Sequence, residues 1–198
     1  MPNIIITFVF TQFLLLSPTQ LLANDEVLYA TAPPVDASFV RFVGFETGEV
    51  IQFSGKDFTM KSDEADAYVP VSSAELDGIP TGSFYSLLKN SNGSIVTIQE
   101  GSRDDPTKVV MILLNGSDQA LSLGVADGSM EVISDIAASS SGQRSVNPIK
   151  IELGVFNKQD SKPIASFDVA LRRGQNITFF ADRNGVRIIE DRFGANAE

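Results

Sequence analysis

Short stretches in which apolar and polar residues alternate with a period of two follow one another along most of the chain. This alternation places apolar side chains on one face of a strand and polar side chains on the other, so it predicts half-buried β-strands. The stretches that alternate, or that are rich in β-branched and aromatic residues, are 38–45, 49–53, 94–99, 149–155 and 167–171. After residue 24, no stretch keeps the apolar spacing of a helix for three turns. We therefore predict an all-β protein.

The turns of the sequence agree with this prediction. Asn-Gly or Asp-Gly pairs, which adopt positive φ at low cost, occur at 77–78, 92–93, 115–116, 127–128 and 184–185. The last pair separates two apolar runs, 177–181 and 186–189, and predicts a hairpin. Residues 109–114 are apolar at every position, as expected of a strand covered on both faces. Short strands with frequent turns favour antiparallel β-sandwiches.

A polar segment divides the strands into two groups of similar size. It runs over residues 101–107 and contains Pro106 between charged residues and a threonine. We predict two small antiparallel β-sandwich domains, residues 24–101 and 109–198, joined by a linker at 102–108. Domains of this size bury only a marginally sufficient core, which favours packing of the two halves on each other.

The first residues have the pattern of an export signal. Residues 1–24 contain no charged side chain, and 4–16 are almost wholly apolar. Such a run is too short for a membrane span, which needs roughly 20 residues. We predict a signal peptide at 1–23, cleaved after Ala23, and a mature protein in the bacterial periplasm. A retained N-terminal anchor is the alternative interpretation.

Composition excludes several classes of chemistry. The sequence contains no Cys, His or Trp, so disulfides, zinc sites built on Cys or His, and Ser-His-Asp or Cys-His catalysis are excluded. The net charge of −10 makes a nucleic-acid partner a poor fit. Residues 25–108 carry 6 basic and 14 acidic side chains, whereas 109–198 carry 9 and 11. A polyanionic ligand would therefore be tolerated better by the second half.

Two acidic clusters are candidates for chemistry: Asp63, Glu64 and Asp66, and the pair Asp104 and Asp105. Neighbouring residues of a strand point to opposite faces, so neither cluster predicts a facing pair of carboxylates. We interpret both as solvated loop acids that cap turns. A carboxylate-dependent hydrolase or lyase, and calcium binding by the first cluster, are the weaker alternatives. We predict no metal and no cofactor.

Basic residues are concentrated late in the chain, and four of them are the candidate binding residues: Arg144, Arg172, Arg173 and Arg187. Guanidinium groups hold carboxylates in a two-pronged geometry, so this group could bind an acidic partner or a uronate polymer. The alternative is that they line the solvated face of an antiparallel sheet. The phenylalanines after the signal are expected in the core.

Several short motifs, in a fixed order, resemble the AlgF family, the periplasmic accessory proteins for O-acetylation of alginate. They are Leu28-Tyr29, Ala32-Pro33, Ser38–Arg41, Ile79-Pro80, Gly82–Tyr85, the stretch RSVNPIKIELGVF at 144–156, and 171–175. Within them, Tyr29, Arg41, Asn147, Pro148 and Gly174 are the predicted structural positions. We expect Asn147 to bond local backbone before a strand that begins at Pro148, and Gly174 to supply positive φ in a turn.

The resemblance implies a non-catalytic adaptor that acts beside the acetyltransferase components of an exopolysaccharide acetylation complex. The anionic polysaccharide is a second partner that the resemblance suggests. The absence of His agrees with a role that does not include the acyl-transfer step itself. The alternative function is a stand-alone carbohydrate-binding or adhesion module, which would bind polymer without any partner.

Overall fold

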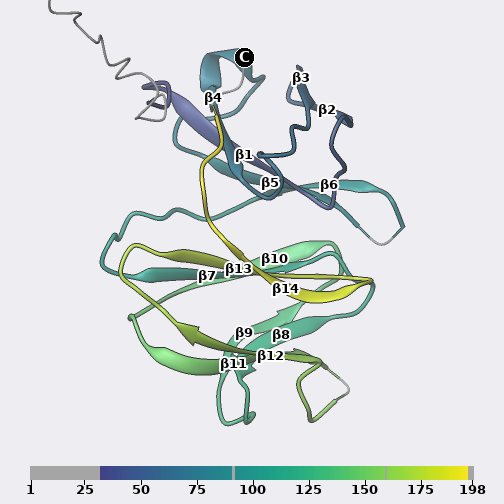
Figure 1. Ribbon diagram of the computed structural model, residues 1–198, viewed down its shortest axis with the longest axis vertical. Coiled ribbons are helices and arrows are strands. Elements are labelled where there is room, and N and C mark those ends of the chain that lie inside the picture. The colour runs from purple at the N-terminus through teal and green to yellow at the C-terminus, as the bar shows by residue number, and fades with distance from the viewer. Residues whose placement is uncertain (1–31, 91, 159, 196–198) are drawn as a thin grey trace, which may run out of the picture. The chain divides into compact units, whose positions relative to one another are not determined.

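The computed structural model describes residues 32–90, 92–158 and 160–195, and these lie in one compact unit, Thr31–Glu198 (Figure 1). The predicted signal peptide at 1–23 and Tyr29 lie outside the described residues. Within the described ranges the regular structure consists of strands and one 3-10 turn, η2 (Ser73–Glu75). The all-β prediction is confirmed. No helix in this part of the chain is long and apolar enough to cross a membrane.

The first part of the chain forms a four-stranded sheet and a separate hairpin. The first sheet has the order β4-β1-β5-β6, with strands β4 (Tyr68–Ser72), β1 (Ala37–Val43), β5 (Phe84–Lys89) and β6 (Ile95–Gln99). The hairpin consists of β2 (Val50–Phe53) and β3 (Lys56–Thr59). Apolar residues such as Val40, Phe42, Ile51 and Phe58 form a core between the two.

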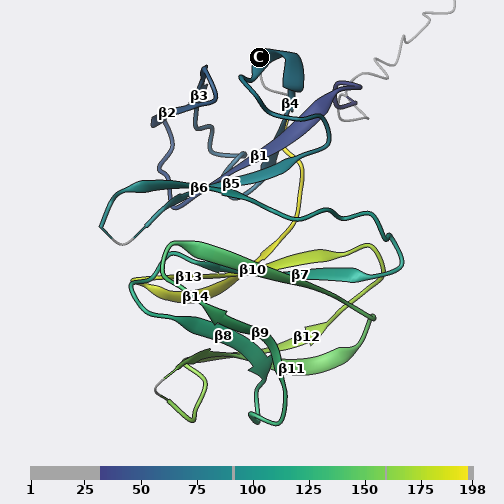
Figure 2. The same ribbon diagram turned by 180° about the vertical axis from the view of Figure 1, so that it is seen from behind.

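The rest of the chain forms two further sheets, seen from both sides in Figures 1 and 2. The second sheet has the order β10-β7-β13-β14, with β10 (Ser140–Val146), β7 (Val109–Asn115), β13 (Asn176–Asp182) and β14 (Gly185–Glu190). The third sheet has the order β12-β11-β8-β9, with β12 (Ala165–Ala170), β11 (Lys150–Asn157), β8 (Leu121–Val125) and β9 (Glu131–Ile136). Their facing side chains form the largest apolar core, which includes Met111, Leu123, Val155 and Phe179.

A third apolar cluster joins the first and second sheets. Val43 and Leu88 from the first sheet pack with Leu114, Phe180 and Ile189 from the second. Strand β7 is therefore covered on both faces, and all seven of its residues are buried, as the uninterrupted apolar run predicted. The division into domains at 24–101 and 109–198 stays a prediction.

The pairing of strands differs from the prediction in two places. β1 pairs with β5, and β7 pairs with β13, in parallel, whereas we predicted antiparallel sandwiches throughout. Parallel neighbours require a long crossover connection, and residues 44–83 and 116–175 provide these. Alternation within a strand reports which face is buried but says nothing about the direction of the neighbouring strand. The predicted hairpin is confirmed, with Asp182 paired to Gly185.

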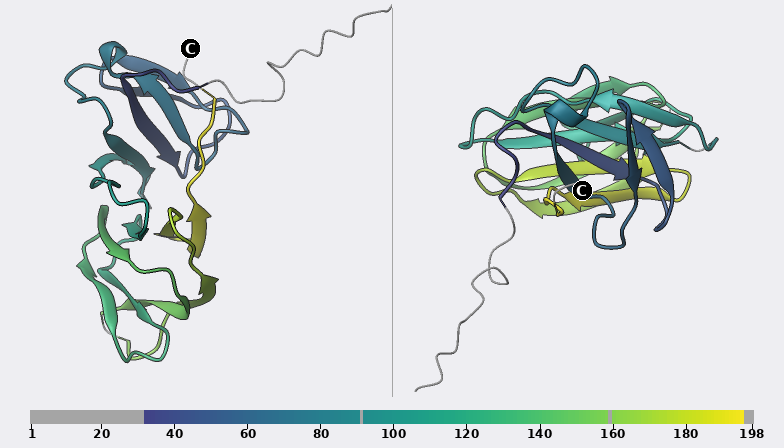
Figure 3. Two further views of the ribbon diagram at one scale, coloured as in Figure 1. Left: turned by 90° about the vertical axis from the view of Figure 1, so that its left-hand side faces the viewer. Right: turned by 90° about the horizontal axis from the view of Figure 1, so that it is seen from above.

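The last described residues, 191–195, lie against β4 of the first sheet. After β14, the segment 191–195 runs back to β4, where the Tyr68 amide donates to the Arg192 carbonyl at 2.9 Å and the Gly194 amide donates to the Tyr68 carbonyl at 2.8 Å (Figure 3). Arg192 also donates side-chain hydrogen bonds to the carbonyls of Asp63 and Ala65. The last described residues of the chain are thus held by the first sheet and the loop before it.

Candidate functional site

A network of charged and polar side chains lies buried between the first sheet, β13 and the C-terminal segment. We call it the ionic cluster, and its members are Arg41, Tyr68, Ser86, Glu100, Arg103, Thr178 and Asp191. Two arginines and two carboxylates balance in charge. Burial of charge is costly unless each charge is paired and hydrogen-bonded, and this network meets that condition for almost every polar atom.

Arg41 is the centre of the ionic cluster and is completely buried. Its guanidinium donates to Ser86 Oγ and Thr178 Oγ1, each at 3.0 Å. It also forms ion pairs with Glu100, at 2.9 Å, and Asp191, at 3.3 Å. Arg41 belongs to β1, so one side chain of the first sheet reaches β13 of the second sheet and the residue that follows β14.

Arg103 completes the ionic cluster from the segment between β6 and β7. Its guanidinium donates to Glu100, to Asp191 and to the hydroxyl of Tyr68. The same guanidinium lies 4.1 Å from the ring centre of Phe84 and 4.7 Å from that of Tyr68, distances typical of cation–π contacts. Nε of Arg103 is the single buried side-chain nitrogen or oxygen without a hydrogen-bond partner in the described part of the chain.

The surroundings set the protonation of the cluster. Burial alone would raise the pKa of Glu100, but the guanidinium groups of Arg41 and Arg103 outweigh it and lower that pKa. Burial raises the pKa of Asp191, and the same two arginines offset this only in part. Burial also raises the pKa of Tyr68 well above its ordinary value, so the neutral phenol donates to Glu100 at 2.7 Å. The phenol hydrogen of Tyr68 is thus directed at a carboxylate whose ionised form is favoured.

The ionic cluster is suited to holding elements together. A Ser-carboxylate hydrogen bond is present, between Ser86 and Glu100, but Ser86 is fully buried and Glu100 is 8% exposed. No substrate reaches such atoms without opening the contact between the sheets. The chemistry available here is therefore the mutual stabilisation of fixed charges, which joins four strands and the segment that follows β14.

The sequence motifs predicted Arg41 as a structural position, but they did not predict the other members of the ionic cluster. Arg103 lies in the predicted linker 102–108, next to the acids that we expected to be solvated, and its side chain is only 7% exposed. One signal was available: Arg41 shares the face of Phe39 and Val43 in a strand whose other residues, apart from Ser38, are apolar. A charged residue on such a face needs partners, although the sequence does not indicate which.

Outside the ionic cluster, the structure brings together several predicted motif residues in what we call the basic end: Lys108, Asn147, Pro148, Ile149, Arg172, Arg173 and Gly174. The Gly174 amide donates to the Lys108 carbonyl at 3.1 Å, and Lys108 Nζ donates to Asn147 Oδ1 at 2.7 Å. The Leu171 amide donates to the Ile149 carbonyl at 2.9 Å. Three segments distant in sequence thus meet at one surface.

Two details of the basic end test the predicted turn chemistry. Gly174 has a φ of +71°, so the prediction of positive φ is confirmed. The prediction for Asn147 is wrong, because its side chain binds Lys108 and the strand begins at Lys150, two residues after Pro148. A side-chain partner 39 positions away cannot be read from local sequence.

Arg172 and Arg173 are exposed, and within the described residues neither guanidinium has a carboxylate partner. The other two candidate binding residues lie elsewhere. Arg144 is on β10 and Arg187 on β14, the opposite edges of the second sheet. Arg144 donates to the Val132 carbonyl, and Arg187 forms a two-pronged ion pair with Asp66. The structure therefore brings only Arg172 and Arg173 into one surface.

The acidic clusters also divide. Asp105 caps a turn as expected, accepting hydrogen bonds from the Thr107 amide and hydroxyl. Glu64 departs from the expectation of a solvated acid, because it is 5% exposed and pairs with Lys61 at 3.4 Å. No group of three or more acidic residues in the described ranges is arranged to hold a metal ion.

Phe193 departs from the expected placement of phenylalanines in the core, with 56% exposure.

The fold and these surfaces define a β-sandwich protein with paired charges inside and, at the basic end, two exposed arginines without a carboxylate partner in the described ranges. The chain belongs to the AlgF family: the family model described as "Alginate O-acetyl transferase AlgF" matches residues 11–178. The resemblance found in the sequence motifs is thereby confirmed.

Individual relatives carry a related description. The "Alginate biosynthesis protein AlgF" of Pseudomonas fluorescens is 28% identical over 188 residues, covering 84% of this chain and 82% of the relative. The protein of the same description from Pseudomonas aeruginosa PAO1 is 24% identical over 185 residues, with 84% and 82% covered. A solved structure of the C-terminal domain of AlgF from P. aeruginosa covers 42% of this chain and 96% of that domain, at 28% identity and a TM-score of 0.37.

Proposed function

We propose that this protein is a non-catalytic accessory protein for O-acetylation of alginate or a related exopolysaccharide, and that it acts in the periplasm after export. The observation that carries the proposal is the family match over residues 11–178. The names of the relatives refer to alginate biosynthesis, and the family description refers to O-acetyl transfer. The charge-free, apolar start of the sequence supports export.

The residues present favour assistance over catalysis. Acyl transfer by a hydroxyl or thiol nucleophile needs a base near neutral pKa, most often His, and this sequence contains neither His nor Cys. Carboxylates could in principle replace the imidazole. The Ser86–Glu100 pair has that composition, but both residues are buried and the pKa of Glu100 is lowered, which makes it a weak base. The acetyl group would therefore be transferred by partner enzymes.

The basic end is the surface through which we propose contact with an acetyltransferase component. Arg172 and Arg173 are exposed and available to carboxylates, and Ile149 beside them is 51% exposed. Arginines around an exposed aliphatic side chain are typical of protein interfaces. Such a surface fits a partner with an acidic rim and a small apolar contact. The remaining acidic surface of this chain makes a long contact with a polyuronate less favourable.

The experiment that tests the proposal measures binding of the purified mature protein to each purified acetyltransferase component. We expect wild-type protein to bind one of them, and the double variant Arg172→Ala with Arg173→Ala to bind at least tenfold more weakly. Arg183→Ala is the matched control. Arg183 is an exposed arginine in the β13–β14 turn, at the opposite end of β13 from Arg172 and Arg173. Absence of binding to every component, at low salt, would contradict the adaptor role.

A further inference from the structure

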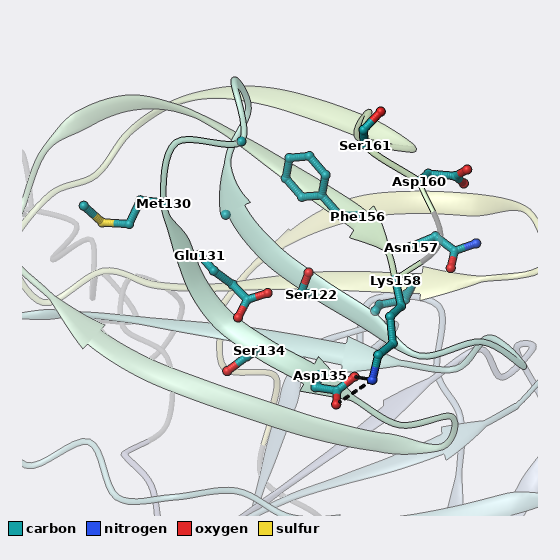
Figure 4. Close-up of a pocket in the computed structure, with 13 residues that line it drawn as sticks. Ser122, Met130, Glu131, Ser134, Asp135, Phe156, Asn157, Lys158, Asp160 and Ser161 are labelled. Carbon is teal, nitrogen blue, oxygen red and sulfur yellow. Dashed lines mark hydrogen bonds and ion pairs between the residues drawn. The ribbon is translucent and has the colours of Figure 1, made fainter.

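A groove of about 700 Å³ lies on the third sheet and has no place in the function proposed so far. It extends over β8, between β9 on one side and the end of β11 on the other, as Figure 4 shows. Ser122, Glu131, Ser134 and Phe156 are among its lining residues. We call it the β8 groove.

Two glycines explain how the sheet forms this groove. Gly124 of β8 and Gly154 of β11 are direct cross-strand partners. A Cβ on Gly124 would lie 2.7 Å from the Met130 carbonyl oxygen, and one on Gly154 would lie 2.8 Å from Pro163 Cβ. Both loops can therefore approach the sheet closely only because these positions lack side chains. Residues of both loops line the groove, and Ser122 and Phe156 lie on the strands between them.

An ion pair crosses the groove. Lys158, which follows β11, pairs with Asp135 of β9 at 3.1 Å, so it spans the width of β8 (Figure 4). Asp135 thus neutralises Lys158, the one cation among the lining residues. Two other lining carboxylates, Glu131 and Asp160, have no cationic partner among the residues that the structure describes. The groove therefore has negative charge available to a ligand.

The groove also offers apolar contact. Phe156 is half-buried on the sheet surface, and Met130 at the border is 64% exposed. An aromatic face near carboxylates favours a ligand that has both a cationic group and an aliphatic part, since the ring attracts cations and the acids pair with them. A uronate polymer is anionic, like the groove, and would be repelled. Charge complementarity thus selects a basic peptide over the polysaccharide.

We propose that the β8 groove is a second docking site, which binds a segment of a partner protein that contains arginine or lysine next to an aliphatic residue. This site is separate from the basic end, which attracts acidic surfaces. The protein would then hold two different surfaces at once, one acidic and one basic, through rigid sheets that share a buried core.

The test is an NMR titration of the ¹⁵N-labelled mature protein with the peptide acetyl-Gly-Arg-Leu-Arg-Gly-amide. We expect the amide signals of Ser122, Glu131 and Phe156 to shift, and the binding to weaken as NaCl is raised. The matched peptide with Glu in place of both Arg residues, oligomannuronate, and a neutral mannose oligosaccharide should leave these signals unchanged. The titration needs no acetyltransferase, so its outcome is independent of the proposed function.

Variants locate the site. Glu131→Gln should weaken binding of the basic peptide by roughly threefold, the size of effect expected when one exposed ion pair is lost. Glu152→Gln is the matched control, because Glu152 is an exposed carboxylate of β11 that does not line the groove. No shift at about 10 mM peptide, a value beyond weak specific binding, would overturn the proposal. Equal shifts with the acidic peptide, or shifts with a saccharide alone, would also overturn it.

Discussion

Two pairs of arginines in this protein have opposite surroundings. Arg41 and Arg103 are enclosed between sheets, and each is paired with both Glu100 and Asp191. Arg172 and Arg173 are exposed in the turn before β13 and have no such partners within the described residues. The first pair is thus held inside the fold by its partners, whereas the second is accessible to the interaction outside the fold that we propose for it.

The largest expected effect in this comparison is on stability, for Arg41→Met. Removing one partner of a buried ionic network leaves carboxylates uncompensated and typically costs about 3–5 kcal/mol. For a protein of this size that corresponds to a fall in melting temperature of roughly 6–20 °C. Arg173→Met is the matched control on the exposed pair and should change the free energy of unfolding by less than about 0.5 kcal/mol. Equal effects of the two variants in chemical denaturation would remove the distinction.

The second prediction concerns the loss of stability at acidic pH. The pKa of Glu100 is lowered in the folded protein from its ordinary value of 4.5, so its ionised form contributes stability above that pH. This contribution is lost as the pH falls through the folded pKa. The difference in free energy of unfolding between wild type and Glu100→Gln should therefore be largest above pH 4.5 and shrink below it.

Asp191 should affect the pH dependence of stability in the opposite direction to Glu100. Its pKa is raised by burial, so protonation is favoured in the folded state, and its own titration adds stability as the pH falls. The wild type should then gain stability relative to Asp191→Asn as the pH falls. Denaturant titrations from pH 3 to 7 measure both differences, and parallel pH profiles for all three proteins would contradict the assigned charges.

A moderate effect is expected at the turn that presents the exposed arginines. Gly174 has a φ of +71°, which β-branched residues adopt only with strain. Gly174→Val should lower the free energy of unfolding by about 1–3 kcal/mol and displace Arg173. Thermal unfolding checks the first effect, and binding to the acetyltransferase component checks the second. An unchanged melting temperature would contradict the conformation of this turn.

The smallest effect on stability is expected for Arg187, which is paired like the buried arginines but exposed like Arg172 and Arg173. Its ion pair with Asp66 is two-pronged, but the side chains are 46% and 24% exposed. Exposed pairs contribute about 0.2–1 kcal/mol. A double-mutant cycle of Arg187→Ala and Asp66→Ala, measured by denaturant unfolding, should give a coupling energy within that range. A coupling as large as that of the ionic cluster would show that burial does not separate the two classes.

The sequence predicted many of the strands, but not β3, β4, β8, β9 and β10, and it predicted the buried site poorly, for physical reasons. Period-two alternation depends on which face of a strand is covered, so β1, β7, β11 and the β13–β14 hairpin could be located from it. The parallel pairs could not, because strand direction depends on long crossovers. Arg103 and Asp191 lie outside any strand and are buried by contacts with residues far away in the chain. Local pattern carries no information about such contacts.

The basic end was predicted in part for a different reason. Arg172, Arg173, Asn147 and Gly174 belong to short motifs that are recognisable in order along the chain. Their meeting at one surface depends on the Gly174–Lys108 and Lys108–Asn147 contacts, which only the folded chain shows. Arg144 and Arg187 have the same side chain but lie on opposite sheet edges.

The most direct test of the account is the acetyl content of the secreted exopolysaccharide, measured by NMR in a strain that lacks this protein. We expect that polymer is still secreted but has lost its acetyl groups. Re-expression of the wild type should restore them, and re-expression of the Arg172→Ala, Arg173→Ala protein, checked for normal stability and export, should not. Normal acetylation in the deletion strain would contradict the central claim.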